Sequence, residues 1–492
     1  MQLTTGECNS KTLLRLFSDL KENMAKLDKK QCYELISAVL NLDWLRQDSS
    51  IIEHYKAFLL DFILVHTDNL KIVLKTLVKN FELGKFDPSE DVDLQHVHDL
   101  LLEISRLVPM MSTSLIPVLS KLFPFYQRDA NIQENYVSNL LFITTYLPSK
   151  QKEILDLIIN HIIQLDVHTI TEPELNREKM DDVESNSKLI NTLDTLMECL
   201  FNFIYDTCYI EDVLNWETTK RLYVDVLFAF NNRVLTTHAC SHVPFLLFYM
   251  CSMKLALCEN TLDALWKKVE NPNSPLVVRQ MAVNYIASLL TRASFISIDL
   301  VVACIDILAK WIDRYIDSQE IRESGVDPSL HAGFYSVCQA LFFVFIFRHK
   351  QLFNMTNGFS YLQGLKFEKM VNCPLNPLRW CHPNVVQNLA SITRHYQLAY
   401  CDTTINRNLR FFLPTENGLN ISVDINFPFH RYLLKNSRRF VSAIYREHET
   451  IGGEIVTTET EEDDFLNDMD ISGVDANLSG LLSSSTIIKS LE

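Results

Sequence analysis

Glycine is scarce in this chain. It supplies 11 of 492 residues, about 2%, against roughly 7% in an average protein. Barrels, dinucleotide-binding turns and phosphate loops need glycine where the backbone turns tightly or approaches a ligand. Neither G-x-G-x-x-G nor G-x-x-x-x-G-K-[ST] occurs in the sequence, so the common phosphate-binding loops are excluded. The low glycine content favours stacked helices joined by short turns.

Catalytic motifs are missing as well, since the sequence contains neither G-x-S-x-G nor H-E-x-x-H. The most suggestive metal spacing is His238-x-Cys240-x-His242, whose side chains could approach zinc from an irregular turn. No second cluster offers the remaining ligands, and an apolar stretch follows directly, so a turn between helices is the favoured interpretation. We therefore expect no metal, no cofactor and no enzymatic activity.

The 12 cysteines are scattered along the chain without paired spacing. The first residues, M-Q-L-T-T-G-E-C-N-S, are not followed by the apolar segment of a secretory signal. The longest apolar runs, near Val243–Met253 and Ala340–Phe347, are shorter than the roughly 18 residues that a membrane span requires. We expect reduced, buried cysteines in a cytosolic or nuclear protein that does not enter a membrane.

Apolar residues recur with helical spacing from about residue 11 to residue 400. In E-I-L-D-L-I-I-N-H-I-I-Q-L-D, one apolar face is formed by Ile154, Leu157, Ile158, Ile162 and Leu165. The rhythm fits antiparallel helix pairs of about 40 residues each, which is the unit of HEAT-type repeats. The sequence therefore predicts an all-α, HEAT-like helical-repeat solenoid over residues 1–402.

One stretch carries a HEAT-type signature. It is V-R-x-x-A, formed by Val278, Arg279 and Ala282. Val278 and Ala282 lie one helical turn apart and are expected to face the neighbouring helix. Arg279 is expected to point towards the connections between repeats, where its guanidinium can bond carbonyl groups left unpaired at helix ends.

Three segments interrupt the solenoid pattern. Residues 171–187 hold six acidic and two basic residues and are expected to form an acidic loop. Residues 403–448 are expected to form an extended aromatic segment and then a short basic helix, both packed on the last repeats. Residues 449–492 contain most of the charge asymmetry and are expected to form an acidic, disordered tail.

The charge balance disfavours direct DNA binding. The formal net charge is −16, of which residues 453–492 contribute −9 through ten acidic residues and one lysine. A negative chain repels a polyanion unless basic residues cluster locally. The one basic cluster that stands out consists of Arg431, Lys435, Arg438 and Arg439. It could serve as an import signal or an anion-facing helix, or it could be an ordinary solvated helix face.

Several hydroxyl side chains are candidate phosphorylation sites. In the tail, Thr458, Thr460 and Ser472 each have an acidic residue three positions later, as acidophilic kinases prefer. Ser274 precedes a proline and could be a proline-directed site or part of a simple turn. A further group, expected in a connection between two helices, is Ser112, Thr113 and Ser114. Ser114 could equally cap the following helix.

Several blocks together resemble one protein family. They are V-R-Q-M-A-V-N-Y-I-A-S, F-Y-S-V-C-Q-A-L-F-F-V-F-I-F-R-H-K-Q-L, N-P-L-R-W-C-H-P-N-V-V, F-P-F-H-R-Y-L-L-K-N-S-R-R-F-V-S-A-I-Y and E-I-L-D-L-I-I-N-H-I-I-Q-L-D-V. The chain is similar over roughly residues 115–448 to the RNA polymerase I-specific transcription initiation factors, the growth-regulated factors of ribosomal RNA synthesis.

The resemblance implies a nuclear and nucleolar HEAT-repeat adaptor, with a possible cytoplasmic pool, that has no catalytic activity. Such an adaptor binds RNA polymerase I near its stalk and connects it to the promoter-bound selectivity factor that contains TATA-binding protein. Protein kinases control it, including through a serine-bearing surface of the amino-terminal repeats, for which Ser112–Ser114 are the candidates. The alternative is a generic helical-repeat carrier, such as a nuclear transport receptor that binds basic cargo.

Overall fold

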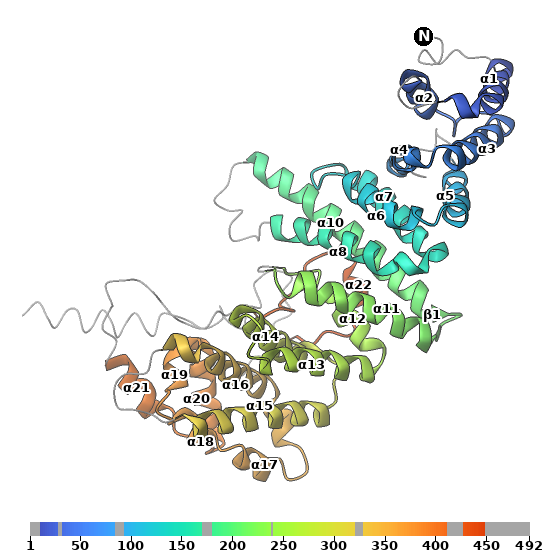
Figure 1. Ribbon diagram of the computed structural model, residues 1–492. Coiled ribbons are helices and arrows are strands. Elements are labelled where there is room, and N and C mark those ends of the chain that lie inside the picture. The colour runs from blue at the N-terminus through green and yellow to red at the C-terminus, as the bar shows by residue number, and fades with distance from the viewer. Residues whose placement is uncertain are drawn as a thin grey trace, which may run out of the picture. The chain divides into compact units, whose positions relative to one another are not determined.

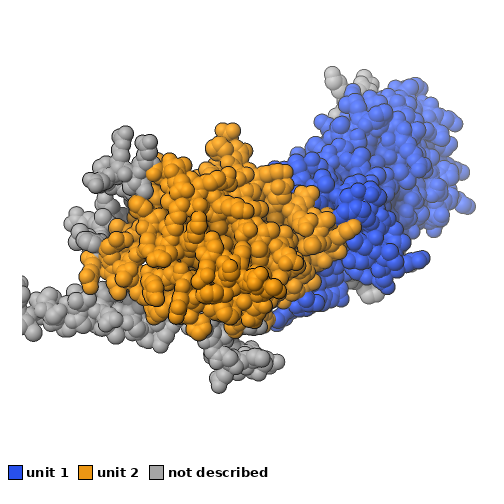
Figure 2. Space-filling model, turned by 90° about the horizontal axis from the view of Figure 1, so that it is seen from below, with its two compact units in different colours: residues 1–250, 431–443 blue, residues 251–430, 444–492 orange. Residues whose placement is uncertain are grey.

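The computed structural model describes residues 10–27, 32–83, 93–169, 180–237, 240–319, 328–410 and 427–447. These residues fold almost entirely into helices, which confirms the all-α prediction (Figure 1). Apart from turns and connections, the described residues contain one two-stranded sheet, a hairpin formed by β1 (Tyr209–Ile210) and β2 (Val213–Leu214). By contacts between residues the chain divides into two compact units, coloured separately in Figure 2.

Unit 1 comprises residues 1–250 and 431–443. Its helices are α1 (Ser10–Glu22), α2 (Tyr33–Leu40), α3 (Ser49–Val65), α4 (Leu70–Lys79), α5 (Gln95–Leu107), α6 (Met111–Lys121), α7 (Ala130–Tyr146), α8 (Gln151–His168), α10 (Met180–Cys208), α11 (Trp216–Ala229), the start of α12 (Phe245–Met253) and α22 (Arg438–Val441). A π-helical turn follows α11 at Phe230–Val234, and single 3₁₀ turns occur at Met24–Lys26, Thr67–Asn69, Asn80–Glu82 and Pro148–Lys150. Helices pack mainly on near neighbours in sequence, as in a repeat array, with α10 against α7, α8 and α11.

The core of unit 1 follows the helical spacing read from the sequence. On α8, Ile154, Ile158, Ile162 and Leu165 are fully buried, and Leu157 is half-buried. Each fully buried aliphatic side chain of this size contributes about 1.5–3 kcal/mol relative to an exposed one. Among these apolar side chains α8 also buries His161 and Asp166, two polar groups that require partners inside the protein.

Unit 2 comprises residues 251–430 and 444–492. Its helices are α13 (Leu255–Glu270), α14 (Leu276–Arg292), α15 (Ile298–Ser318), α16 (Ala332–Phe353), α17 (Gly358–Gly364), α18 (Phe367–Val371), α19 (Pro377–Trp380), α20 (Pro383–His395) and α21 (Asp402–Arg410), with a 3₁₀ turn at Pro328–His331. At its centre α16 packs against α14, α15 and α20, and α14 packs also against α13. Because α16 is apolar on all sides, neighbouring helices must surround it.

The apolar character of α16 also bears on membrane insertion. Within the described part of the chain, one helical stretch, Ser329–Phe353, is long and apolar enough to cross a bilayer, with a mean hydropathy of 1.7. Of its most apolar window, 72% is buried inside the protein. Burial of that extent is what the central helix of a helical core shows, and it accounts for the apolar composition.

The structure corrects two sequence-based boundaries. The acidic loop expected over residues 171–187 ends earlier, because α10 begins at Met180. The extended segment expected from residue 403 begins with a helix instead, because α21 continues to Arg410. The first stretch was predicted to be a loop because it is acidic and poor in apolar residues, although a solvated helix can have the same composition.

Candidate interaction surfaces

Three hydroxyl side chains cluster at the start of α6. The sequence placed them in a connection, but α6 begins at Met111 and includes all three in its first turns. Ser112 Oγ donates a hydrogen bond to the carbonyl oxygen of Pro109 at 3.2 Å, and Thr113 Oγ1 donates to that of Met110 at 2.9 Å. Ser114 does not cap the helix, and its side chain is buried at 9% exposure.

The helix start decides which of these hydroxyls can be modified. Thr113 is exposed and Ser112 half-buried, whereas Ser114 faces the interior of unit 1. Backbone N–H groups at a helix N-terminus are unpaired and attract negative charge. A phosphate on Ser112 or Thr113 is therefore compatible with the fold. Its added charge would change the affinity of a partner that contacts this turn.

The V-R-x-x-A stretch lies at the start of α14. Arg279 Nε donates to the carbonyl oxygen of Val269 at 2.9 Å, at the C-terminal end of α13. Ala282 is fully buried and Val278 is half-buried. Ser274 is half-buried in the turn before Pro275, which is the N-cap residue rather than the first residue of the helix. These residues join neighbouring helices of unit 2, and Ser274 lies at the rim of that junction.

A segment from the far end of the chain completes unit 1. We call residues 431–443 the return segment. Its anchor is Asp194 on α10, whose carboxylate accepts hydrogen bonds from Asn436 N at 2.8 Å and Ser437 N at 2.9 Å. Ser437 Oγ donates to the same carboxylate at 2.5 Å. One carboxylate thus holds two backbone N–H groups and one hydroxyl of the return segment.

Aromatic rings hold the return segment on either side of this anchor. Tyr432 makes edge contacts with Phe245 at 4.9 Å and His242 at 5.5 Å between ring centroids. Phe440 stacks on Phe201 of α10 at 5.1 Å and meets Tyr249 edge-on at 5.7 Å. Tyr432 and Ser437 also join their hydroxyl groups at 2.8 Å. Pairs of rings in such arrangements each contribute about 0.5–1.5 kcal/mol beyond the buried area.

The short basic helix does not lie where the sequence predicted. This helix, α22, has four residues and packs on α10 of unit 1 rather than on the last repeats. Of the basic cluster, Arg431, Lys435 and Arg438 are exposed. Arg439 forms an ion pair with Glu198 of α10 at 2.8 Å. All four side chains of the cluster are thus exposed, and one of its charges is already paired.

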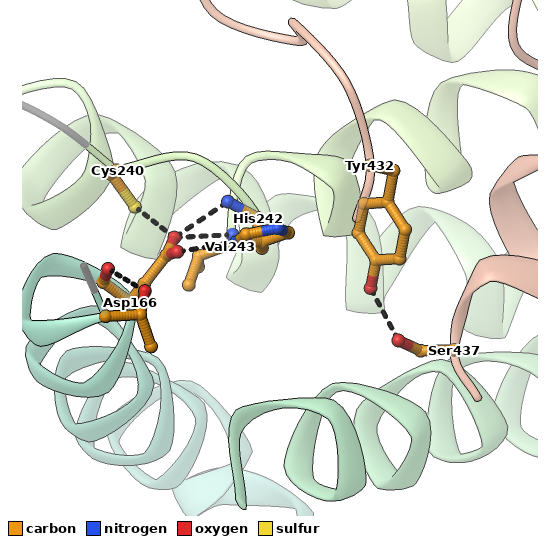
Figure 3. A network of polar contacts seen from close by, with 7 residues as sticks. Asp166, Cys240, His242, Val243, Tyr432 and Ser437 are labelled. Carbon is orange, nitrogen blue, oxygen red and sulfur yellow. Dashed lines mark hydrogen bonds and ion pairs between the residues drawn. The ribbon is translucent and has the colours of Figure 1, made fainter. Parts of the chain in front are cut away.

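Two of the candidate zinc ligands converge on a carboxylate (Figure 3). Asp166, at the end of α8, accepts hydrogen bonds from the Cys240 thiol at 3.2 Å and from His242 Nδ1 at 2.8 Å. It also accepts the backbone N–H groups of His242 at 2.8 Å and Val243 at 3.1 Å. Among the described residues there is no group of three side chains arranged to hold a metal, and His238 lies outside them. Asp166 therefore fixes the turn before α12.

The electrostatics of this turn follow from its geometry. Burial alone would raise the pKa of Asp166, but the hydrogen bond and charge of His242 and two backbone N–H groups outweigh it. The net result is a pKa below the usual value for aspartate. For Cys240, burial and then the adjacent Asp166 charge raise the thiol pKa well above its usual value. Cys240 is therefore an unreactive thiol.

The hairpin between α10 and α11 was not predicted. Its two turn residues, Glu211 and Asp212, both have positive φ angles, 50° and 61°, and neither is glycine. Tyr205 OH donates to Asp212 Oδ1 at 2.7 Å and secures the turn. Ile210 and Val213 remain 57% and 69% exposed. The signal in the sequence was Y-I-E-D-V-L, two strand-forming pairs around an acidic pair, too short to stand out between long helices.

Comparison with known proteins shows which family this chain belongs to. The family profile described as RNA polymerase I specific transcription initiation factor RRN3 matches residues 3–188 and 168–453. The chain belongs to the RRN3 family. The mouse RNA polymerase I-specific transcription initiation factor RRN3 is 33% identical, over 94% of this chain and 81% of the mouse protein. The rrn3 factor of Schizosaccharomyces pombe is 26% identical over 93% of this chain and 83% of its own.

The fold agrees with the RRN3 assignment. The crystal structure of RNA polymerase I transcription initiation factor Rrn3 superposes with a TM-score of 0.76 at 24% identity, covering 89% of this chain and 90% of the other. This likeness confirms the all-helical, HEAT-like fold. RRN3 proteins are transcription initiation factors and not enzymes, and the family assignment displaces the alternative of a nuclear transport receptor.

The sites Thr458, Thr460 and Ser472 lie outside the described residues.

Proposed function

We propose that this protein binds RNA polymerase I near its stalk and connects it to a promoter-bound selectivity factor that contains TATA-binding protein. The observation that carries the proposal is the match to the RRN3 family over nearly the whole chain. The names of these relatives describe initiation factors specific for RNA polymerase I. Such a protein acts in the nucleus and nucleolus, where ribosomal RNA genes are transcribed.

The physical character of the chain supports an adaptor that contacts proteins rather than DNA. Two units of packed helices present preorganised surfaces, so binding does not require ordering of a flexible chain. The formal net charge of −16 favours docking on basic protein surfaces and opposes contact with phosphate backbones. We propose that direct DNA binding is weak and that the contact with promoter DNA is made by the partner.

Phosphorylation is the proposed control. Ser112 and Thr113 are its best-placed candidates, because a phosphate there would add about −1.5 to −2 charges at a helix start without disturbing the core. A binding surface that fits this turn would then be repelled or left with a buried, unpaired charge. Ser274 and the three tail sites remain candidates that kinases could use independently.

The test is recovery of RNA polymerase I from nuclear extract by the purified chain, with its subunits identified by mass spectrometry. Recovery by the wild type, together with loss by the Ser112→Asp/Thr113→Asp double variant, is the expected result. Ser120→Asp is the matched control, because this serine is exposed near the end of the same helix and should leave recovery unchanged. Absence of polymerase from the wild-type sample would refute the binding proposal, and equal loss in both variants would refute the switch.

A further inference from the structure

The return segment is attached to unit 1 through a buried serine. Ser437 has no exposed surface, and its hydroxyl lies between the Asp194 carboxylate at 2.5 Å and Tyr432 OH at 2.8 Å. Its own backbone N–H bonds to Asp194 as well. The segment offers little regular structure to hold itself in place, since α22 has four residues. The position of the segment therefore depends strongly on the contacts made around Ser437.

The residues around Ser437 are basic and exposed. The local sequence is K-N-S-R-R, in which Lys435, Arg438 and Arg439 flank the serine at positions −2, +1 and +2. All three side chains are exposed, and so is Asn436. Kinases that select basic substrates bind such side chains in acidic subsites before they transfer phosphate. The recognition elements thus face solvent, while the acceptor hydroxyl faces inward.

We propose that Ser437 is a phosphorylation site and that its modification detaches the return segment from unit 1. The reaction is ordinary phosphoryl transfer from ATP, catalysed by a kinase that prefers basic substrates. Ser437 Oγ forms a bond to the γ-phosphorus, the bond between that phosphorus and the β–γ bridging oxygen breaks, and ADP leaves. The hydroxyl proton passes to the catalytic base of the kinase.

The phosphorylated serine cannot occupy its former position. The hydroxyl that donates to Asp194 would be replaced by a group with about −1.5 to −2 charges and no reliable donor. That charge would be buried against the Asp194 carboxylate, and the two described side chains that bond the Ser437 hydroxyl, Asp194 and Tyr432, are not basic. Two like charges in direct contact inside a protein are strongly unfavourable. The aromatic anchors Tyr432 and Phe440 would leave together with the serine.

The kinase must act on an opened state, because Ser437 is inaccessible in the closed one. A short segment can open locally at a lower free energy than the unfolding of the whole domain. Phosphorylation then traps the opened state by removing the contact that closes it. The rate of modification therefore reports how often the Asp194 anchor is released.

The first experiment measures that rate on the full-length chain with ATP and the purified catalytic subunit of a basophilic kinase. Phosphate at Ser437 is quantified by mass spectrometry in the wild type and in Asp194→Ala. Loss of three hydrogen bonds to a charged acceptor should speed modification of the variant by about tenfold or more. Ser437→Ala gives the background. No phosphate at Ser437 in Asp194→Ala would overturn the proposal.

The second experiment asks whether the modification detaches the segment. Hydrogen exchange is compared between the unmodified chain, the chain phosphorylated at Ser437, and Ser437→Asp. We expect protection to fall within residues 431–443 and on the facing part of α10, with α4 to α6 unchanged. Ser442→Asp is the matched control, because it adds the same charge at an exposed position of the same segment. Unchanged protection in the phosphorylated chain, or a loss spread over all of unit 1, would overturn the proposal.

Discussion

The buried side chain of Arg348, which is 1% exposed, donates a hydrogen bond from Nε to the carbonyl oxygen of Leu290 at 2.8 Å. Its Nη2 donates to the same carbonyl at 2.6 Å and to that of Ala293 at 3.1 Å, and its Nη1 donates to Gln351 Oε1 at 2.8 Å. Leu290 and Ala293 lie at the C-terminal end of α14, where carbonyl groups lack helical partners and carry partial negative charge. Arg348 therefore joins the two central helices of unit 2.

Replacing Arg348 should strongly destabilise unit 2. Arg348→Ala leaves buried carbonyl groups unpaired and opens a cavity, so the free energy of unfolding should fall by about 3 kcal/mol or more. Arg348→Lys should recover little, because an ammonium group cannot reproduce the planar set of donors. Urea denaturation is the measurement. Lys310→Ala, at an exposed position of α15, should change stability by less than about 0.5 kcal/mol, and an equal effect of both changes would contradict the assignment.

His161 should make unit 1 sensitive to mild acid. Burial lowers the pKa of His161 to about 4, and its Nε2 lies 2.7 Å from Gln133 Oε1. In the unfolded chain the histidine takes up a proton near pH 6.5, whereas in the folded chain it remains neutral until about pH 4. The contribution of His161 to the free energy of unfolding is therefore complete above pH 7, and it is lost as the pH falls from 6.5 towards 4. Between pH 7.5 and pH 5 the loss should be about 2 kcal/mol.

Urea denaturation of the wild type and His161→Gln at these two pH values tests this dependence. The glutamine variant should lose less stability on acidification, because it has no proton to gain. Ile159→Val is the control, since it removes buried volume from the same helix without changing a titratable group. It should lower stability equally at both pH values. A wild-type pH dependence that survives in His161→Gln would show that other groups cause it.

The hairpin turn should be improvable by one substitution. Glu211 adopts φ of 50°, a left-handed conformation that costs a residue with a Cβ about 1–2 kcal/mol. Asparagine tolerates this region better, so Glu211→Asn should raise the free energy of unfolding of unit 1 by about 0.5–1 kcal/mol. Glu211→Gln removes the same charge without favouring the conformation and should give no gain. Equal denaturation midpoints for the two variants would mean that the turn is not strained.

Local contacts were open to prediction from the sequence, and contacts between distant segments were not. The bond from Arg279 to Val269 follows from a short motif, because both residues lie at the same junction of consecutive helices. The apolar face of α8 follows from spacing alone. In contrast, Asp194 and Ser437 are 243 residues apart, and neither residue type indicates the other. No periodic pattern shows that a late segment returns to an early helix.

The candidate sites show the same division. Cys240 and His242 were singled out by spacing, yet the residue that explains them, Asp166, lies 74 positions from Cys240 at the end of another helix. Ser112, Thr113 and Ser114 were proposed together as candidates in a connection between helices, but the first turns of α6 contain all three and bury Ser114. A shift of a helix start by a few residues changes which side chains face solvent, and helix starts are the least certain part of a pattern.

Asp166 should contribute more to stability than any surface carboxylate on the same helix. Asp166→Asn replaces one oxygen by an NH₂ group, which would face the donors of His242, Cys240 and Val243. The free energy of unfolding of unit 1 should fall by about 3 kcal/mol at pH 7. Asp156→Asn is the matched control, because Asp156 pairs with the half-exposed Arg233 at 2.9 Å, and such a pair contributes at most about 1 kcal/mol.

The pH dependence of the free energy of unfolding, compared between the wild type and Asp166→Asn, gives a second test of this prediction. Since the folded-state pKa of Asp166 lies below its usual value of 3.8, its charge stabilises the fold at all pH values above that range. This contribution is lost as the pH falls through the folded-state pKa, because the carboxylate then becomes protonated. The stabilities of the wild type and Asp166→Asn should therefore differ fully at pH 7 and approach each other below about pH 3.8. A difference that stays constant into this acid range would assign the effect of the substitution to packing, and not to the charge that holds the turn before α12.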